Sequence, residues 1–245
     1  MRLLQVIRGL HPRDGGPPRV VIGSGIALAE AGHAVTVLST IAPGDEEAVH
    51  DYIRPAQDAG VEFVFVDQVR APSIWFPSRE VRLAEAIAAT DVVHCHGIWS
   101  SLLLTAARIA DALAKPYFVS VHGLLSPWAI RKSRRKKQLA TALFGIRRYC
   151  ENARGMIFGT RGECEVSTAL GSRLRPFFIP NGVSPGTGLQ PVTPQDRVRL
   201  IAKAPPVERW SRTVLFFSRI HPKKGLDMLI EAFAKVAPRF PGTGL

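Results

Sequence analysis

Short, continuously apolar runs bounded by turn residues recur along the first three quarters of the chain. They cover residues 3–7, 35–38, 61–66, 92–95, 117–121, 156–158 and 177–179. Segments with a helical pattern of apolar positions lie between several of them, at residues 19–31, 79–89, 101–114, 136–152 and 163–170. Continuously apolar strands that alternate with helices are typical of a parallel sheet covered on both faces. The pattern therefore predicts an α/β fold with a doubly wound, Rossmann-like parallel sheet.

The composition changes at residue 184. Proline and glycine crowd the stretch that follows, which is typical of a linker. An apolar run at 213–218 then predicts a strand, and a one-sided apolar pattern at 225–237 predicts a helix. One strand and one helix cannot cover their own apolar faces. We therefore predict a complete domain at 1–183, a linker at 184–211, and the first βα unit of a truncated second Rossmann-like domain at 212–245.

The net charge of +12 has a local origin. Residues 131–154 hold nine basic residues against one acid, Glu151. The densest part of this window consists of Arg131, Lys132, Arg134, Arg135, Lys136 and Lys137. Such a block suits an anionic membrane surface or an acidic substrate, or it is a solvated helix face. Aromatic residues only flank it, so we predict no nucleic-acid partner.

Other classes of protein are disfavoured by what the sequence contains. The three cysteines form no C-x-x-C pair and have no histidine at metal-ligand spacing, so we predict no metal site and no disulfide framework. The uncharged stretches are too short for a membrane span, and Arg8 interrupts the apolar N-terminus too early for a signal peptide. We therefore expect a cytoplasmic protein, peripheral at the cytoplasmic face of a membrane if the basic window binds lipid.

The loop after the first predicted strand contains Gly15 and Gly16. Two glycines before a helix let the backbone approach a ligand and direct N–H groups at an anion, although a plain glycine-rich turn has the same sequence. A dinucleotide-binding fingerprint is not fulfilled, because Leu28 stands where its third glycine should be. The pattern thus argues against a dehydrogenase.

Two predicted strands lead directly into a His-Gly pair. These pairs are His96-Gly97 and His122-Gly123. Ligands of doubly wound sheets bind beyond the carboxyl ends of the strands, so both histidines are candidates for a functional role. A single histidine is more often structural, but two at equivalent strand ends favour function.

Near the C-terminus, Arg219 and Lys224 flank a predicted strand-to-helix turn. The guanidinium fork of arginine, the point charge of lysine and the N-terminus of a helix together suit a diphosphate. Solvated charges on a turn are the alternative.

At these residues the chain resembles the GT4-type glycosyltransferases, which have the two-domain GT-B fold. The similar segments are Gly15-Gly16, 28–37, 93–99, 120–128, 179–183 and 217–227, in family order and over nearly the whole chain. The Gly-Leu-Leu-Ser-Pro-Trp-Ala stretch with the basic window after it is similar to the subgroup that builds bacterial surface polysaccharides.

The resemblance implies transfer of a sugar from a nucleotide-sugar donor to a glycan or lipid-linked acceptor, with retention of anomeric configuration and without a metal or cofactor. It implies that His122 lies beside the reacting anomeric carbon. We expect His96, from its place at a strand end, to lie on the acceptor side of the same crevice. Gly15 and Gly16 would approach the donor sugar or its phosphate, and Arg219 and Lys224 would hold the diphosphate.

The chain departs from the family in one respect. Enzymes of this type carry two glutamates separated by seven residues in the donor domain, and no glutamate pair here has that spacing. We therefore expect residues 1–245 to be a fragment that is inactive by itself. The alternative function is a non-catalytic α/β module that binds anions or membranes through the basic window, for which the Arg219–Lys224 turn would be unnecessary.

Overall fold

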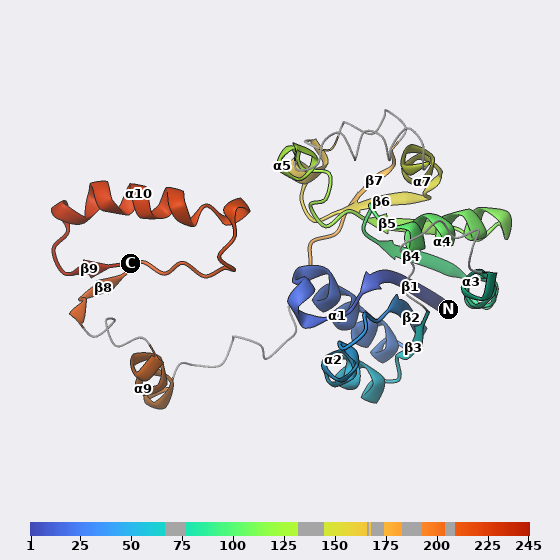
Figure 1. The fold of residues 1–245 in the computed structure, drawn as a ribbon, viewed down its shortest axis with the longest axis horizontal. Coiled ribbons are helices and arrows are strands. Elements are labelled where there is room, and N and C mark those ends of the chain that lie inside the picture. Colours follow the sequence, from blue (N-terminus) through green and yellow to red (C-terminus); the bar gives the residue numbers. More distant parts are fainter. Residues whose placement is uncertain (67–76, 132–144, 166, 168–173, 183–192, 204–208) are drawn as a thin grey trace. The chain divides into compact units, whose positions relative to one another are not determined.

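The chain folds into two compact units, Met1–Ser184 and Pro185–Leu245 (Figure 1). The structure is a computed structural model, and it describes residues 1–66, 77–131, 145–165, 167, 174–182, 193–203 and 209–245. The first unit carries the sheet that the sequence predicts, and the second is much smaller.

A seven-stranded sheet forms the centre of the first unit, in the order β3-β2-β1-β4-β5-β6-β7. All neighbouring strands are parallel. The strands are β1 (Arg2–Gly9), β2 (Ala34–Thr40), β3 (Glu62–Phe65), β4 (Val92–His96), β5 (Tyr117–Ser120), β6 (Gly155–Phe158) and β7 (Pro176–Phe178). The predicted α/β class and Rossmann-like parallel sheet are confirmed.

Helices cover the sheet on both faces (Figure 1). The described residues of this unit form the helices α1 (Gly16–Glu30), α2 (Glu46–Asp58), α3 (Pro77–Ala88), α4 (Ser101–Ala112), α5 (Pro127–Arg131), α7 (Ile146–Asn152) and α8 (Arg161–Glu165). Helices α1 and α2 pack on one face, where Val21 and Ile53 contact the core around Val37. Helices α3, α4 and α7 pack on the other face, around Val93 and Val119. Burial of these side chains contributes on the order of 1.5–3 kcal/mol each.

Helix α2 is absent from the helices expected above. Its sequence, EEAVHDYIRPAQD, is polar apart from a narrow stripe that buries Val49, Ile53 and Ala56, and it contains Pro55. A proline inside a helix removes a backbone hydrogen bond, which costs about 3 kcal/mol in an isolated helix. Packing of the stripe against α1, in the core cluster around Val37, offsets that cost. The sequence of α2 by itself contains no signal for such packing.

The second unit has little structure of its own. It contains α9 (Pro194–Lys203), β8 (Arg212–Thr213), α10 (Leu226–Val236) and β9 (Thr243–Gly244), and β8 pairs with β9 in parallel. Helix α9 lies within the range expected to be a linker. The expected strand at 213–218 is wrong, because the ladder ends at Thr213 and residues 214–218 form no strand. A strand needs a neighbour to bond to, and the two residues of β9 offer one only briefly.

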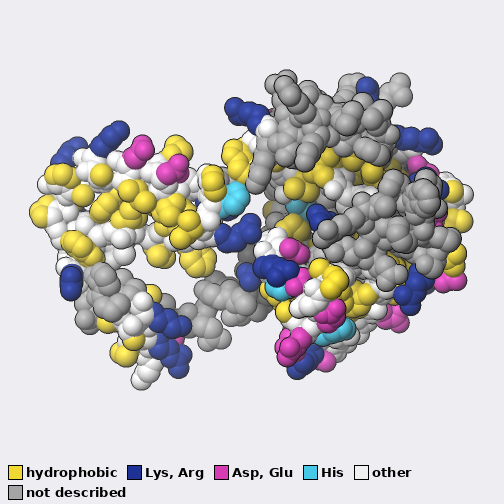
Figure 2. Space-filling view, viewed as in Figure 1, with side chains coloured by type: hydrophobic (Ala, Val, Ile, Leu, Met, Phe, Trp, Pro, Cys, Tyr) yellow, Lys and Arg dark blue, Asp and Glu magenta, His cyan; other side chains and the backbone are white. Residues whose placement is uncertain are grey.

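Hydrophobic side chains gather on the surface of this second unit (Figure 2). Leu215 is 74% exposed, Phe217 94%, Ile220 86% and Met228 72%. Exposed apolar side chains of this size are normally covered by further secondary structure or by a partner. The unit by itself therefore has no closed core among its described residues.

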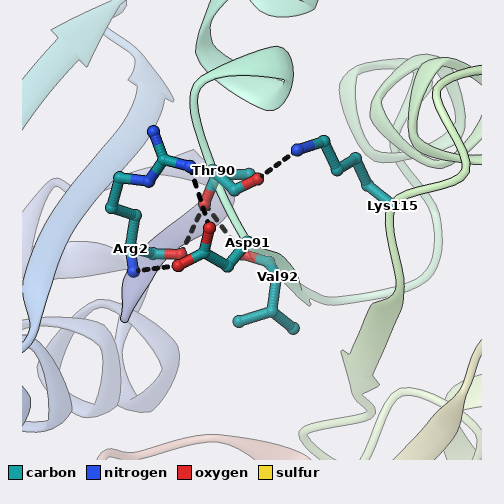
Figure 3. Close-up of polar contacts among 5 residues, drawn as sticks. All are labelled: Arg2, Thr90, Asp91, Val92 and Lys115. Atoms are coloured by element: carbon teal, nitrogen blue, oxygen red, sulfur yellow. Dashed lines mark hydrogen bonds and ion pairs between the residues drawn. The ribbon is translucent and has the colours of Figure 1, made fainter.

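A polar cluster joins the amino ends of β1 and β4 (Figure 3). The Asp91 carboxylate accepts hydrogen bonds from the backbone N of Arg2 at 2.8 Å and from its Nη2 at 2.9 Å. The Thr90 hydroxyl lies 2.9 Å from Arg2 O and 3.1 Å from Val92 O, and Lys115 Nζ donates to Thr90 O at 2.7 Å. The amino ends lie opposite the edge where doubly wound sheets bind ligands, so this cluster serves stability.

We expect Thr90→Val to destabilise the first unit by about 1 kcal/mol, because it removes a buried hydroxyl that bonds a strand-end carbonyl. Thermal unfolding monitored by circular dichroism should show a lower midpoint. Thr36→Val is the matched control, since Thr36 Oγ1 makes only an exposed 3.4 Å contact with Glu62. Equal midpoints for the two variants would contradict the assignment.

Candidate functional site

From β1 the sheet grows in one direction through β2 and β3, and from β4 it grows in the opposite direction through β5, β6 and β7, so the strand order reverses between β1 and β4. The loops that follow these two strands therefore run to opposite faces of the sheet and leave a crevice between them. A cavity of about 450 Å³ lies at this position, lined by the ends of β1 and β2, the start of α1, and His96 at the end of β4. The cavity is where the fold favours ligand binding.

The Gly15–Gly16 loop forms the start of α1 beside this cavity, whose lining includes Asp14 and Pro17. Gly15 has φ 93°, a value that favours glycine, and a Cβ on Gly16 would meet no atom within 4 Å. Pro17 and Pro18 follow and carry no backbone N–H. Of the first three residues of α1, only Gly16 therefore has a backbone N–H to donate. The loop lets a ligand approach the backbone closely, but it cannot surround an anion with several N–H groups.

An ion pair forms part of the lining of the cavity. Arg13 Nη2 lies 2.5 Å from Asp45 Oδ2, and the two residues come from the loops after β1 and β2. His11 Nδ1 accepts a hydrogen bond from Arg13 N at 3.0 Å, and its Nε2 lies 3.9 Å from Asp45 Oδ1. These residues were not predicted from the sequence, because only the pairing of β1 with β2 brings their loops together.

The two candidate histidines contact each other. His96 Nδ1 lies 3.1 Å from His122 Nε2, and the rings stack with centroids 5.3 Å apart. His96 is only 3% exposed, and its Nε2 has no hydrogen-bond partner among the described residues. A buried ring nitrogen without a partner is costly. His96 is also one of the residues that line the cavity.

A third histidine, His94, extends this pair along β4. His94 and His96 are two residues apart and so lie on the same face of the strand, with ring centroids 4.0 Å apart. His94 Nε2 lies 2.8 Å from Ser120 Oγ, and the register of β4 with β5 pairs His96 with Ser120. His94 and Ser120 were not predicted, although the alternation of His94 and His96 in the sequence is a signal for them.

The backbone around each histidine is unusual. Gly97 has φ 120°. Its N–H donates to Ser120 O at 2.9 Å, and its carbonyl accepts a hydrogen bond from the buried Tyr149 hydroxyl at 3.0 Å. His122 itself has φ 52° and Gly123 has φ 71°. A left-handed conformation is uncommon for a residue other than glycine, and such residues occur more often at functional sites.

Burial keeps the three imidazoles neutral. It lowers the pKa of His94 to about 4 and the pKa of His96 well below its ordinary value. Burial also lowers the pKa of His122, against the opposing effect of the nearby Glu163 carboxylate. Neutral imidazoles can exchange hydrogen bonds with hydroxyl groups but do not supply positive charge to a phosphate.

These pKa shifts predict loss of stability in acid. The unfolded chain takes up a proton on His94 near its ordinary pKa of 6.5, whereas the folded chain does so only near 4. The free energy of unfolding is therefore at its full value above pH 6.5 and falls as the pH drops from 6.5 toward 4. His94 accounts for up to about 3 kcal/mol of this decrease. Urea unfolding at pH 7.5, 5.5 and 4.5 should show a weaker pH dependence for His94→Gln than for the unchanged chain. An equal dependence would contradict the prediction.

The remaining predicted residues lie elsewhere. Arg219 and Lys224 belong to the second unit, and Lys224 is exposed directly before Gly225, the N-cap of α10. Arg131 ends α5 and is exposed. The other residues of the predicted membrane patch fall outside the described residues: Lys132, Arg134, Arg135, Lys136 and Lys137. Within the described parts of the chain, no group of three or more His, Cys, Asp or Glu side chains could hold a metal ion.

Comparison with known proteins identifies related chains and folds. The model of Glycosyltransferase Family 4 matches residues 14–186. The structure is similar to that of Anabaena HepE in complex with UDP and glucose, with a TM-score of 0.68 and 16% identity over 98% of this chain and 59% of HepE. It is also similar to UDP-GlcNAc 2-epimerase from Neisseria meningitidis bound to UDP-GlcNAc, with a TM-score of 0.51 and 13% identity over 98% of this chain and 64% of the epimerase. The chain thus spans less than two thirds of the length of either protein. A search of curated proteins finds no match.

Proposed function

Because the chain belongs to glycosyltransferase family 4, we propose that it supplies the acceptor-side half of an enzyme that transfers a sugar from a nucleotide-sugar donor to a glycan or lipid-linked acceptor in polysaccharide synthesis. The observation that carries this proposal is that His96, which lines the cavity at the carboxyl edge of the sheet, contacts the His122 ring. The nucleotide and sugar found in the HepE and epimerase structures support a nucleotide-sugar donor.

His122 is the proposed catalytic residue. Its Nε2 is engaged by His96, so contact with the substrate falls to Nδ1. With His96 donating from Nδ1, His122 carries its proton on Nδ1 and can donate it to an oxygen of the donor sugar near the anomeric carbon. Because the ring is held before substrate arrives, it loses little freedom at the moment of reaction.

His96 is the proposed contact on the acceptor side. With its Nδ1 proton shared with His122, its buried Nε2 is an acceptor that lacks a partner among the described residues. An acceptor hydroxyl in the cavity would satisfy that nitrogen and be oriented for attack. Gly15 and Gly16, beside the same cavity, let a sugar or phosphate approach the backbone closely.

The donor's diphosphate is assigned to Arg219 and Lys224 of the second unit. Both are exposed, and Lys224 lies at the turn before α10, where the helix dipole adds to its charge. We propose retention of anomeric configuration, as the family resemblance implies. We also propose no requirement for a metal, since Arg219 and Lys224 can supply the positive charge that a diphosphate needs. The proposed location is the cytoplasmic face of a membrane. No helix in the described ranges is long and apolar enough to cross a bilayer.

Transfer is tested on a form of the protein with a whole donor-side domain. If the reading frame continues beyond Leu245 and encodes two glutamates separated by seven residues, its product is used. Otherwise residues 1–184 are joined to the donor-side half of HepE. A panel of nucleotide sugars should give nucleoside diphosphate only when a glycan or lipid-linked acceptor is present, EDTA should not inhibit, and NMR should show the donor's anomeric configuration in the product. No acceptor-dependent release with any donor from the continued reading frame would contradict the proposal.

The basic window gives a separate prediction about membranes. Each basic residue near an anionic surface contributes about 1 kcal/mol, so six of them can hold the protein there reversibly. We expect the chain to bind phosphatidylcholine vesicles that contain phosphatidylserine and to dissociate as salt is raised. A variant with Arg134, Arg135, Lys136 and Lys137 changed to alanine should bind less. Equal binding to pure phosphatidylcholine vesicles would refute the membrane assignment.

A further inference from the structure

One carboxylate joins the two loops that follow β5 and β6. Glu163 Oε1 accepts a hydrogen bond from the backbone N of Gly123 at 2.5 Å, and its Oε2 accepts one from Gly159 N at 2.8 Å. Gly123 directly follows His122, and Gly159 directly follows β6. Glu163 therefore contacts the backbone of the proposed catalytic turn from a different part of the chain.

The position of Glu163 is itself fixed locally. Thr160 Oγ1 accepts a hydrogen bond from Glu163 N at 3.1 Å, as the residue before a helix does when it caps that helix. The buried Ser167 hydroxyl donates to Glu163 O at 2.6 Å. In the usual capping pattern the glutamate returns to its own helix start, whereas this side chain reaches one residue further back and across to the neighbouring loop.

The turn that Glu163 contacts is one that the backbone does not favour. His122 and Gly123 are consecutive left-handed residues, with φ of 52° and 71°. A left-handed non-glycine residue costs on the order of 1–3 kcal/mol and persists only when its surroundings hold it. The backbone closes this turn with one hydrogen bond, from Leu124 N to Val121 O at 3.2 Å. From outside the turn, the His96 ring contacts the His122 side chain and the Glu163 carboxylate accepts the Gly123 N–H.

We propose that Glu163 is a positioning residue that holds the His122–Gly123 turn left-handed and thereby keeps the His122 ring on His96. Its importance for transfer rests on the proposed function, but the positioning itself stands on contacts within the first unit. The carboxylate has a second effect, because its charge raises the pKa of His122 against burial. Among the described residues, the other ionisable groups beside that ring are His94 and His96 of β4, both kept neutral by burial.

The first test uses residues 1–245 unchanged. A scalar coupling across the hydrogen bond should connect the Gly123 amide nitrogen with the Glu163 carboxyl carbon in a labelled sample. This measurement needs no variant, so it does not depend on whether a substituted chain folds. Lack of that coupling, with coupling across β-sheet hydrogen bonds detected in the same sample, would overturn the proposal.

The second test compares Glu163→Gln with Glu165→Gln, an exposed glutamate on the same short helix. A glutamine has one carbonyl oxygen and no charge, so it cannot accept from both glycines. Hydrogen exchange at the Gly123 amide should become about 10-fold or more faster in Glu163→Gln, as expected for loss of a charge-assisted bond. The His122 ring should titrate at lower pH. Glu165→Gln should change neither, and unchanged exchange and titration in Glu163→Gln would overturn the proposal.

A kinetic measurement separates this inference from the proposed function. In a form of the protein that transfers sugar, Glu163→Gln should lower kcat by about 10-fold while KM for the donor changes little, because the substrate-binding groups remain. Unchanged kcat in a variant with a disturbed His122 turn would overturn the catalytic part of the inference. Failure of every form to transfer sugar would instead contradict the proposed function, and the coupling and exchange results would still decide the positioning.

Discussion

Replacing His122 by alanine is expected to reduce sugar transfer about 100- to 1000-fold, the range seen when a fixed donor to the transition state is removed. The structure holds this ring on His96 at 3.1 Å and leaves Nδ1 for the substrate. The nucleotide and its diphosphate are assigned to the second unit, so binding of the donor should change little. Steady-state kinetics together with calorimetric binding of the nucleotide sugar measures both quantities.

His33→Ala is the matched control for this experiment. His33 is half-buried and directly precedes β2, at the edge of the sheet opposite the cavity. It should retain normal transfer and normal donor binding. Turnover of His122→Ala close to that of His33→Ala would sink the catalytic assignment. Weaker donor binding with kcat unchanged would show that His122 holds the donor equally in the ground and transition states.

Residues 1–245 by themselves are expected to show no transfer, which is the second large effect. In the GT-B fold, as the family resemblance implies, the reaction takes place between two domains. The described residues of the second unit form the helices α9 and α10 and a ladder of two-residue strands. Its described residues contain no identifiable groups that would recognise the base, the ribose and most of the sugar of a nucleotide-sugar donor. Binding of these parts of the donor, which are remote from the reacting bond, positions a substrate for reaction.

The same unit should also associate with itself or with hydrophobic probes. Phe217 and Ile220 are almost fully exposed, next to the turn that carries Arg219. Exposed apolar surface and unpaired strand edges of this kind favour association. Analytical ultracentrifugation and binding of a hydrophobic dye, compared between residues 1–245 and residues 1–184, would show whether that surface belongs to the second unit.

The inactivity is tested by offering purified residues 1–245 a panel of nucleotide sugars and acceptors. Hydrolysis, transfer and saturable binding are measured for each donor. The form with a whole donor-side domain is the positive control under the same conditions. Turnover of residues 1–245 comparable to that control would show that the active site lies wholly within this chain.

The elements of the first unit could be predicted because their signals are local. Buried parallel strands are continuously apolar, so runs such as residues 3–7 and 92–95 indicate β1 and β4 directly. Helix α2 could not be predicted, because its polar sequence with Pro55 favours a helix only after packing. The strand expected at 213–218 failed for the opposite reason, since an apolar run forms a strand only where another strand pairs with it.

The site divides in the same way. The sequence by itself determined that His96 and His122 lie where two consecutive strands end and that each is followed by glycine. In a doubly wound sheet such residues lie at the carboxyl edge, where ligands bind. Only the tertiary structure decided that the two rings touch, since they are 26 residues apart and meet through the parallel register of β4 with β5. It alone decided that Glu163 holds the turn 40 residues away in sequence. Side-chain contacts between loops depend on where the sheet places the strand ends, and that placement is a property of the packed core.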